Sequence, residues 1–195
     1  MELAQRVRIP VVQSIVWNAL NDPAILKDCL PGCQSFDRTG ENSFEVVLVA
    51  KVGPVKATFK GAVTLSDVKP PESYRISGSG KGGVAGFAKG GAEVHLESID
   101  DSAATVMSYQ VTASVGGKLA QIGSRLVTGA ARKMANDFFT GFVRSLSGDP
   151  LMKVEIETLV LDKGVLDKGV LDKGVVDKGV LDKDADKQGL QAEQG

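Results

Sequence analysis

The sequence predicts an α+β domain in which a curved antiparallel sheet of about six to seven strands wraps a long C-terminal helix. Three observations carry this prediction. One segment that alternates apolar and polar residues precedes two short helical segments. Several segments with two-residue periodicity follow, and a long stretch with helical spacing ends the series. A sheet whose single apolar face packs on the stripe of one helix is the simplest arrangement of these elements.

The first elements can be placed by their periodicity and capping residues. Residues 2–9 alternate as a strand that ends at Pro10, and residues 11–20 follow a helical period. Residues 21–30 begin a second short helix, which Asn21 or Asp22 can cap. Pro23 then occupies the first helical position, where its missing N–H costs nothing.

The middle of the chain has the periodicity of strands. One face of each segment is apolar and the other polar, which is typical of an antiparallel sheet with one face in water. Gly53 and Pro54 mark a hairpin turn between two of the segments. The five segments cover residues 43–53, 55–65, 73–80, 92–98 and 104–115.

The last predicted element is one long helix over residues 116–147, with an apolar stripe toward the sheet. It contains several glycines, each of which costs about 0.8–1 kcal/mol in a helix relative to alanine. Such residues indicate a need for close approach or for space. Under a curled sheet, the stripe could line an apolar cavity suited to a lipophilic ligand. Tight packing of helix on sheet is the alternative.

Cys29 and Cys33, the two cysteines of the chain, flank a Leu-Pro-Gly turn. A redox pair usually has two intervening residues at a helix N-terminus, whereas here three intervene and Cys29 lies near a helix end. A zinc site needs three or four ligands, and the chain has one histidine. We therefore expect both cysteines to pack structurally, and we predict no metal site.

Two other features have a functional and a structural interpretation. His95 alternates between Glu93 and Glu97 on the polar face of a strand, which favours a solvated histidine over a general base. The glycine-rich residues 78–91 lack the Lys-Ser/Thr ending of a phosphate-binding loop. They are expected to form a hairpin with glycine at its bends, or else a mobile lid at a cavity rim. No catalytic constellation is present, so the sequence predicts no catalytic residues.

The last helix also carries a cationic outer face. It is formed by Lys118, Arg125, Arg132, Lys133 and Arg144, with Asp137 as its acidic residue. A solvated helix face is one interpretation. The other is a contact with anionic lipid headgroups or with an acidic partner surface.

Composition divides the chain into a domain at residues 1–147 and a low-complexity tail at residues 148–195. The first part carries 16 Lys or Arg against 13 Asp or Glu, and the second 7 against 11. With a net charge of −1, the totals do not suggest a nucleic-acid partner. No signal peptide or membrane-spanning segment is expected, so a cytoplasmic location is the default.

From residue 160 the tail reads VLDKG, VLDKG, VLDKG, VVDKG and VLDKD. In a helix each five-residue unit advances by 500°, and in a strand an odd period alternates faces. Neither geometry gives a continuous apolar stripe, and each Asp offsets a Lys. We expect a flexible spacer that does not bind a membrane as an amphipathic helix.

Residues 14–33, "SIVWNALNDPAILKDCLPGC", resemble the start of the carbon monoxide dehydrogenase G-subunit family. "GSRLV" (residues 123–127) and "ANDFFTGF" (residues 135–142) are similar to that family's C-terminal helix. The element order resembles the helix-grip fold of the START and birch-pollen-allergen superfamily. The resemblance covers residues 1–147.

The resemblance implies a non-catalytic accessory protein of a molybdenum-containing carbon monoxide dehydrogenase or related hydroxylase. It implies a lipophilic ligand, with a quinone expected and no tightly bound cofactor, and a peripheral contact at the inner face of the cell membrane. An assembly or tethering protein with a filled core is the alternative, and a cyclase or hydrolase is a weaker one. The expected cavity residues are Leu30, Pro31, Phe59, Tyr109, Ile122, Leu126, Met134 and Phe138.

Overall fold

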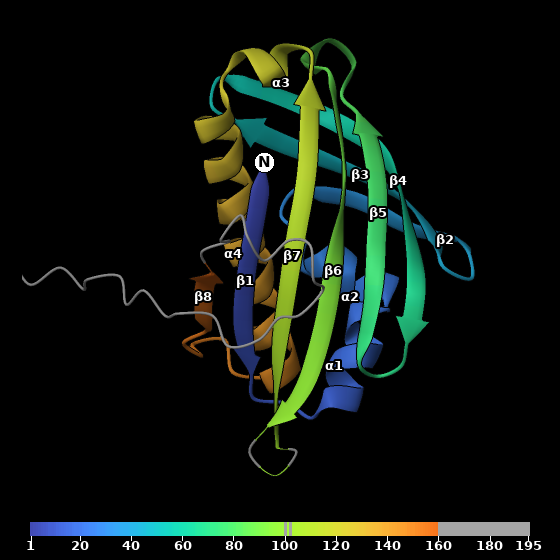
Figure 1. Cartoon of the computed structure of the whole chain (residues 1–195), viewed down its shortest axis with the longest axis vertical. Helices are drawn as coiled ribbons and strands as arrows, with labels where there is room; N and C mark the ends of the chain where they lie inside the picture. Colours follow the sequence, from blue (N-terminus) through green and yellow to red (C-terminus); the bar gives the residue numbers. More distant parts are fainter. Residues whose placement is uncertain (100, 102, 160–195) are drawn as a thin grey trace, which may run out of the picture.

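The computed structural model describes residues 1–99, 101 and 103–159, which form one strongly curved antiparallel sheet with helices on its inner side (Figure 1). The strands follow the order β2-β3-β4-β5-β6-β7-β1-β8 across the sheet. Their bounds are β1 Glu2–Ile9, β2 Cys33–Gly40, β3 Ser43–Val52, β4 Val55–Lys69, β5 Ser73–Lys81, β6 Phe87–Ile99, β7 Ala104–Gly116 and β8 Glu155–Leu159. The helices are α1 Gln13–Leu20, α2 Pro23–Cys29, η1 Gly83–Ala85, α3 Lys118–Gln121 and α4 Ser124–Ser147.

The predicted start of the chain is confirmed. The carboxylate of Asp22 caps α2 by accepting a 2.8 Å hydrogen bond from the Ala24 N–H, and Pro23 is the first helical residue. The turn after α2 requires Gly32, which has a φ of +75°. A Cβ at this position would lie 2.3 Å from the Val49 carbonyl oxygen, so glycine lets the turn dock directly on β3.

The long C-terminal helix is interrupted near its start, contrary to our prediction of one helix over residues 116–147. A four-residue helix, α3, ends before Gly123, and α4 then runs without a break to Ser147. Gly123 has a φ of +91°, outside the helical region. This glycine lets the chain change direction, so α3 lies across one end of the molecule (Figure 1).

Within the described residues the sheet has eight strands, two of which the periodicity did not predict. β2 follows the Leu-Pro-Gly turn and forms one edge, and its residues are largely exposed. β8 forms the other edge by pairing with β1, with Val7 opposite Ile156. This strand lies in the segment that we expected to be a tail, so the sheet extends past residue 147. The repeats from residue 160 onward lie outside the described residues.

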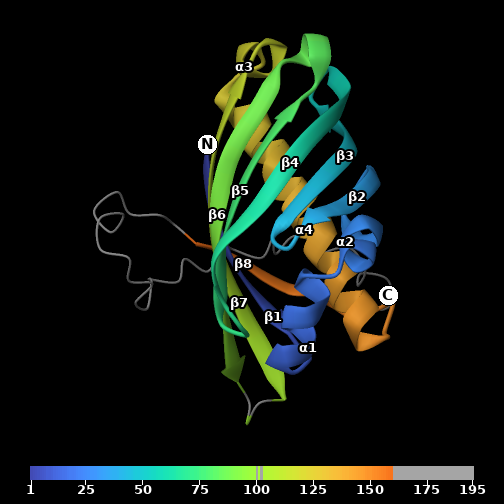
Figure 2. The same ribbon diagram turned by 90° about the vertical axis from the view of Figure 1, so that its right-hand side faces the viewer.

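The core fills the half of the molecule that contains α1 and the C-terminal part of α4 (Figure 2). The Trp17 and Tyr74 rings meet edge to face with their centroids 5.4 Å apart. Phe142 and Val143 of α4 are fully buried there. Burial of large aromatic and aliphatic side chains on this scale is the main stabilising contribution in such a domain. In the other half, around the start of α4, several inward side chains of the sheet remain partly exposed.

Candidate functional site

The inner face of the sheet is only partly covered where it passes the N-terminal half of α4. Val52, Val55, Phe59 and Val63 point toward the helix side of the sheet, yet each remains partly exposed. Farther along the sheet, Tyr74 and other inward side chains are buried. The domain therefore presents an apolar inner surface that its own side chains do not cover completely.

Small residues at inward positions of neighbouring strands explain this incomplete filling. Registered pairs place Gly61 against Gly80, Gly78 against Val63, and Gly90 against Ala113. Gly61 and Gly90 are required by the backbone, because a Cβ would lie 2.6 Å from the Ser79 oxygen and 2.2 Å from the Thr112 oxygen respectively.

Gly80 is different, because its nearest contacts to an added Cβ are β4 backbone atoms at 3.6–3.9 Å. These are ordinary van der Waals distances, and its φ is not positive. A side chain at Gly80 would therefore project toward the space between sheet and helix. Absence of a side chain there leaves room instead of satisfying a backbone constraint.

The predicted cavity residues do not form one cluster. Tyr109 and Phe138 belong to the filled core: the Tyr109 ring lies 5.1 Å from that of Phe139, and Phe138 stacks on Phe142 at 5.6 Å between centroids. Met134 and Ile122 are partly buried on the helix side.

The remaining predicted positions lie in two separate places. The Phe59 ring packs directly on Gly82, where an added Cβ would lie 2.5 Å from the ring. Leu126 is 51% exposed, and its Cδ1 reaches the β3–β4 turn at Gly53. Leu30 and Pro31 are partly buried in the turn that docks on β3. Phe59 and Leu126 thus border the incompletely covered surface, whereas Leu30 and Pro31 belong to the α2–β2 junction.

A buried polar network that the sequence did not predict lies against the filled core, to which its member Tyr109 belongs. The Gln5 side chain is fully buried, and its Nε2 donates to Asn136 Oδ1 at 2.9 Å and to Thr158 Oγ1 at 3.2 Å. The Tyr109 hydroxyl donates to Gln5 Oε1. Burial raises the pKa of Tyr109, which keeps the phenol protonated as a donor. The network joins β1, β7, β8 and α4.

One signal in the sequence pointed to Gln5. It shares the inward side of β1 with Val7 and Ile9, where a polar amide is out of place. Buried amides usually have partners, so this position could have indicated a partner, though not which residue supplies it. Asn136 and Thr158 come from distant segments, and only the fold brings them together.

The two cysteines have the environment of packed thiols. Cys29 lies beside α4, where a Cβ added at Gly141 would be 3.8 Å from the Cys29 Cα atom. The Cys33 thiol donates to the Ser35 carbonyl oxygen at 3.3 Å. Burial raises the pKa of both thiols; Asp28 adds to the effect at Cys29. The thiolate, which attacks electrophiles and binds metals, is therefore disfavoured.

We expect both thiols to react more slowly with iodoacetamide at pH 7 than an unstructured cysteine peptide. Because the pKa values of both thiols are raised in the folded state, the alkylation rate should still be increasing at pH values above the pKa of a free thiol. Alkylation rates followed by intact-mass measurement at several pH values test this expectation. A rate at pH 7 above that of the peptide would indicate an activated thiol.

The other sequence-predicted features lie on the surface. His95 is exposed on β6. The glycine-rich segment forms the end of β5, η1 and the start of β6, so it is a hairpin with a short helical turn at its tip. Lys118, Arg125, Arg132 and Lys133 are all exposed, and Lys133 Nζ lies 2.5 Å from Asp137 Oδ2.

A shallow open groove of about 720 Å³ lies on the outer face of the sheet, between β4, β5, β6 and β7. It is lined by small polar residues such as Thr64, Ser77 and Ser114, and none of the expected cavity residues lines it. Within the described ranges, no three Cys, His or acidic residues come together to bind a metal. No described helix has the length and hydropathy to cross a bilayer.

Similar solved structures support this architecture. A conserved protein from Geobacillus kaustophilus superposes with a TM-score of 0.72 at 29% identity, covering 80% of this chain and 99% of that chain. A START superfamily protein from Mycobacterium smegmatis has a TM-score of 0.59 at 8% identity, with coverages of 75% and 97%. The Zhui aromatase/cyclase from Streptomyces sp. R1128 has a TM-score of 0.53 at 12% identity, with coverages of 75% and 93%.

The last two similarities are evidence for the fold alone, and they confirm the predicted helix-grip class. No curated protein matches the sequence. The family model for the carbon monoxide dehydrogenase G-subunit (CoxG) matches residues 6–147, which include every element from α1 to α4. The chain therefore belongs to the CoxG family.

Proposed function

We propose that this protein is a non-catalytic accessory protein of a carbon monoxide dehydrogenase-type molybdenum enzyme, and that it binds a lipophilic molecule, a quinone, on its apolar inner surface. It links the enzyme to the inner face of the cell membrane. Family membership supports the partner. The observation that supports a bound lipophilic ligand is the partly exposed inner surface beside Gly80, between Phe59 and Leu126.

The chemistry of this surface favours a lipophile over a polar substrate. Its border residues are apolar, and apolar pockets with few polar groups suit ligands of this kind. The groups of the nearby polar network are hydrogen-bonded to one another, and the Tyr109 hydroxyl donates to Gln5 Oε1. No buried side-chain polar atom among the described residues lacks a partner. These groups stabilise the fold, which supports a binding role over a cyclase or hydrolase activity.

Equilibrium dialysis of the purified chain with decylubiquinone tests the ligand. We expect saturable uptake of about one molecule per chain, with a rise in Tm through preferential binding to the native state. Absence of uptake, with the domain folded, would favour the filled-core tether. Retention of a purified carbon monoxide dehydrogenase-type enzyme on the immobilised chain tests the partner separately.

A further inference from the structure

One end of the molecule combines exposed cations with exposed apolar tips, and we call it the basic end. It is built by the β3–β4 turn, by η1 with its flanking strand ends, and by α3 with the first turn of α4 (Figures 1 and 2). Its exposed cations are Lys51, Lys56, Lys60, Lys81, Lys118 and Arg125, and its apolar tips are Val84, Phe87 and Leu126.

The segments that build the basic end contain no acidic residue. They lie within the longer stretches 46–66, 73–92 and 103–136, in which neither Asp nor Glu occurs. Glu45, Asp67, Glu93 and Asp137 fall just outside these ranges. The cations of this end therefore have no carboxylate neighbour within their own segments.

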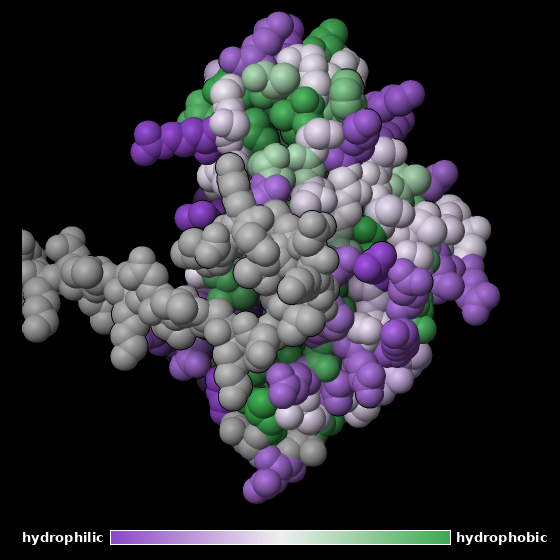
Figure 3. Space-filling view, in the orientation of Figure 1, coloured by the Kyte–Doolittle hydropathy of each residue, from purple (hydrophilic) through white to green (hydrophobic). Residues whose placement is uncertain are grey.

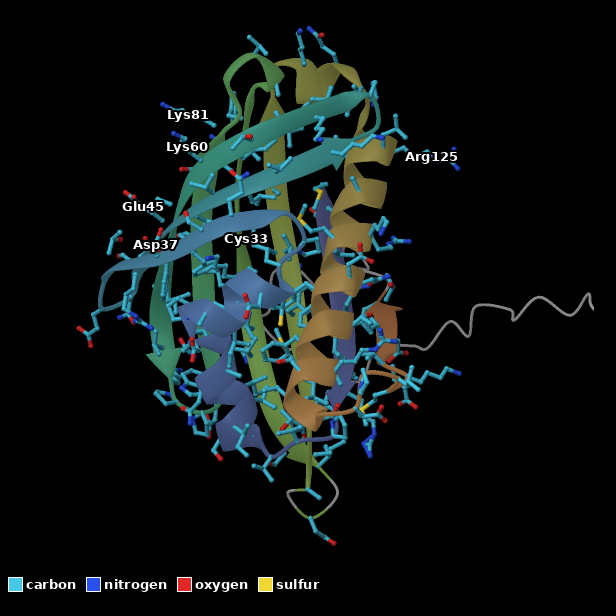
Figure 4. All side chains as sticks on the ribbon, turned by 180° about the vertical axis from the view of Figure 1, so that it is seen from behind. Cys33, Asp37, Glu45, Lys60, Lys81 and Arg125 are labelled. Carbon is cyan, nitrogen blue, oxygen red and sulfur yellow. The ribbon has the colours of Figure 1, made fainter. Side chains whose placement is uncertain are left out.

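Two pairs of lysines face each other across the strands of this end. Lys51 is the register partner of Lys56 beside the β3–β4 turn, and Lys60 is the partner of Lys81. Figure 4 shows Lys60 and Lys81 together on one flank of the end, with Arg125 on the opposite flank. Like charges directly opposite one another destabilise a sheet. None of these lysines forms an ion pair with another described residue.

Arg125 adds a third unfavourable arrangement. It is the second residue of α4, where the helix dipole favours an acidic side chain, and the first turn of α4 contains no acidic residue. Local arrangements that oppose the stability of the fold are expected where function requires them.

Farther from this end, the sheet carries acidic residues as well as cations. Arg75 lies 2.9 Å from Glu93 and 3.5 Å from Asp67. The acidic residues Asp37 and Glu45, which are also register partners, lie farther from the basic end than Lys60 and Lys81 in Figure 4. The acidic residues of the sheet thus lie outside the segments that build the basic end.

Exposed apolar side chains occupy the tips of this end. Val84 is 86% exposed in η1, and Phe87 is 45% exposed at the start of β6. In the space-filling view, apolar side chains gather at this end and hydrophilic ones border them (Figure 3). Apolar tips among cations are the combination by which proteins bind the interface of an anionic bilayer.

We propose that the basic end docks on an anionic lipid bilayer, with Val84 and Phe87 entering the interface and the lysines contacting headgroups. This inference rests on the proposed function for its membrane contact and assigns that contact to a surface. The basic end includes Lys118 and Arg125, whereas Arg132 and Lys133 lie outside it. Since Phe59 packs directly beneath Gly82 of the same hairpin, docking places the apolar inner surface next to the bilayer.

Co-sedimentation with vesicles tests the proposal on the full chain. We expect binding to phosphatidylcholine vesicles that contain phosphatidylglycerol, weaker binding to phosphatidylcholine alone, and a loss of binding as salt rises. Lys51→Glu should weaken binding about 25-fold, since each lysine charge at an anionic surface contributes roughly a fivefold factor. Val84→Asp should weaken it about tenfold or more.

Lys51→Glu has a second expected effect that separates docking from folding. It places opposite charges at a register pair, so Tm should rise by about 1–4 °C while vesicle binding falls. Matched controls lie elsewhere on the surface: Leu151→Asp changes a side chain that is 87% exposed after α4, and Arg132→Glu reverses a charge on α4. Both controls should bind vesicles as the unchanged chain does.

Three outcomes would overturn the proposal. The first is equal binding by Lys51→Glu, Val84→Asp and the unchanged chain. The second is equal weakening by the Leu151 or Arg132 control. The third is retention of the partner enzyme through Lys51 without any vesicle binding, which would assign the end to an acidic protein surface. Decylubiquinone uptake by Lys51→Glu in solution should persist, so failure of docking and failure of quinone binding are distinguishable.

Discussion

Gly80→Leu is expected to abolish decylubiquinone uptake while the domain stays folded. The leucine side chain would start from ordinary contact distances to β4 and extend into the space that we assign to the ligand. Because the leucine fills space without displacing neighbours, the free energy of unfolding of the variant should be unchanged or slightly higher, as expected when a compatible glycine is replaced. Equilibrium dialysis and urea unfolding of the same variant measure the two effects.

Gly129→Leu is the matched control for this variant. Gly129 is exposed on α4, and an added Cβ there meets no atom within 4 Å. The same chemical change should therefore leave ligand uptake intact. If instead Gly80→Leu lowers the free energy of unfolding by about 1–3 kcal/mol, the space is already filled, because overpacking a dense core has that cost.

Gln5→Leu is expected to lower the free energy of unfolding by about 3 kcal/mol. Leucine removes the acceptor of the Tyr109 hydroxyl and the donor to Asn136 and Thr158. Each buried polar group left without a partner costs about 1–3 kcal/mol. Urea unfolding at neutral pH, with the midpoint and slope both fitted, measures the change.

The double variant with Tyr109→Phe tests whether these groups act as a network. Removing the hydroxyl together with its acceptor leaves fewer unpaired groups, so the two costs should not add. The double variant should be more stable than the sum of the single effects predicts. Additive losses, or a Gln5→Leu effect below about 0.5 kcal/mol, would show that the network contributes little to stability.

The fold class could be predicted because its main elements have strong local signals. Alternation identified β3 and β4, and Asp22 with Pro23 identified the start of α2. β2 was missed because it is a largely exposed edge strand without a regular apolar face. β8 was missed because its five residues become a strand by pairing with β1, a contact that no local pattern records.

The candidate site could be predicted less well, for a physical reason. Helical spacing placed Ile122, Leu126 and Phe138 on one stripe, but the stripe spans both the filled core and the open rim. Which part a residue joins depends on the side chains opposite it in the sheet. Glycines in β5 suggested bends, whereas at Gly80 the missing side chain also leaves space.

The basic end was only partly visible in the sequence. The recurrence of Lys118 and Arg125 suggested a cationic helix face, yet the fold joins these residues to Lys51 and Lys56 from the β3–β4 turn. The break at Gly123 makes this possible, because it separates α3 from α4. A sequence pattern read along one helix could not combine residues from three turns.

The most direct test of ligand binding is native mass spectrometry of the purified full chain, followed by solvent extraction of whatever remains bound. We expect a stoichiometric lipophilic molecule, a quinone by its fragmentation, that is absent from Gly80→Leu and retained by Gly129→Leu. A chain that carries no such molecule, and that also takes up no added decylubiquinone, would contradict the binding role.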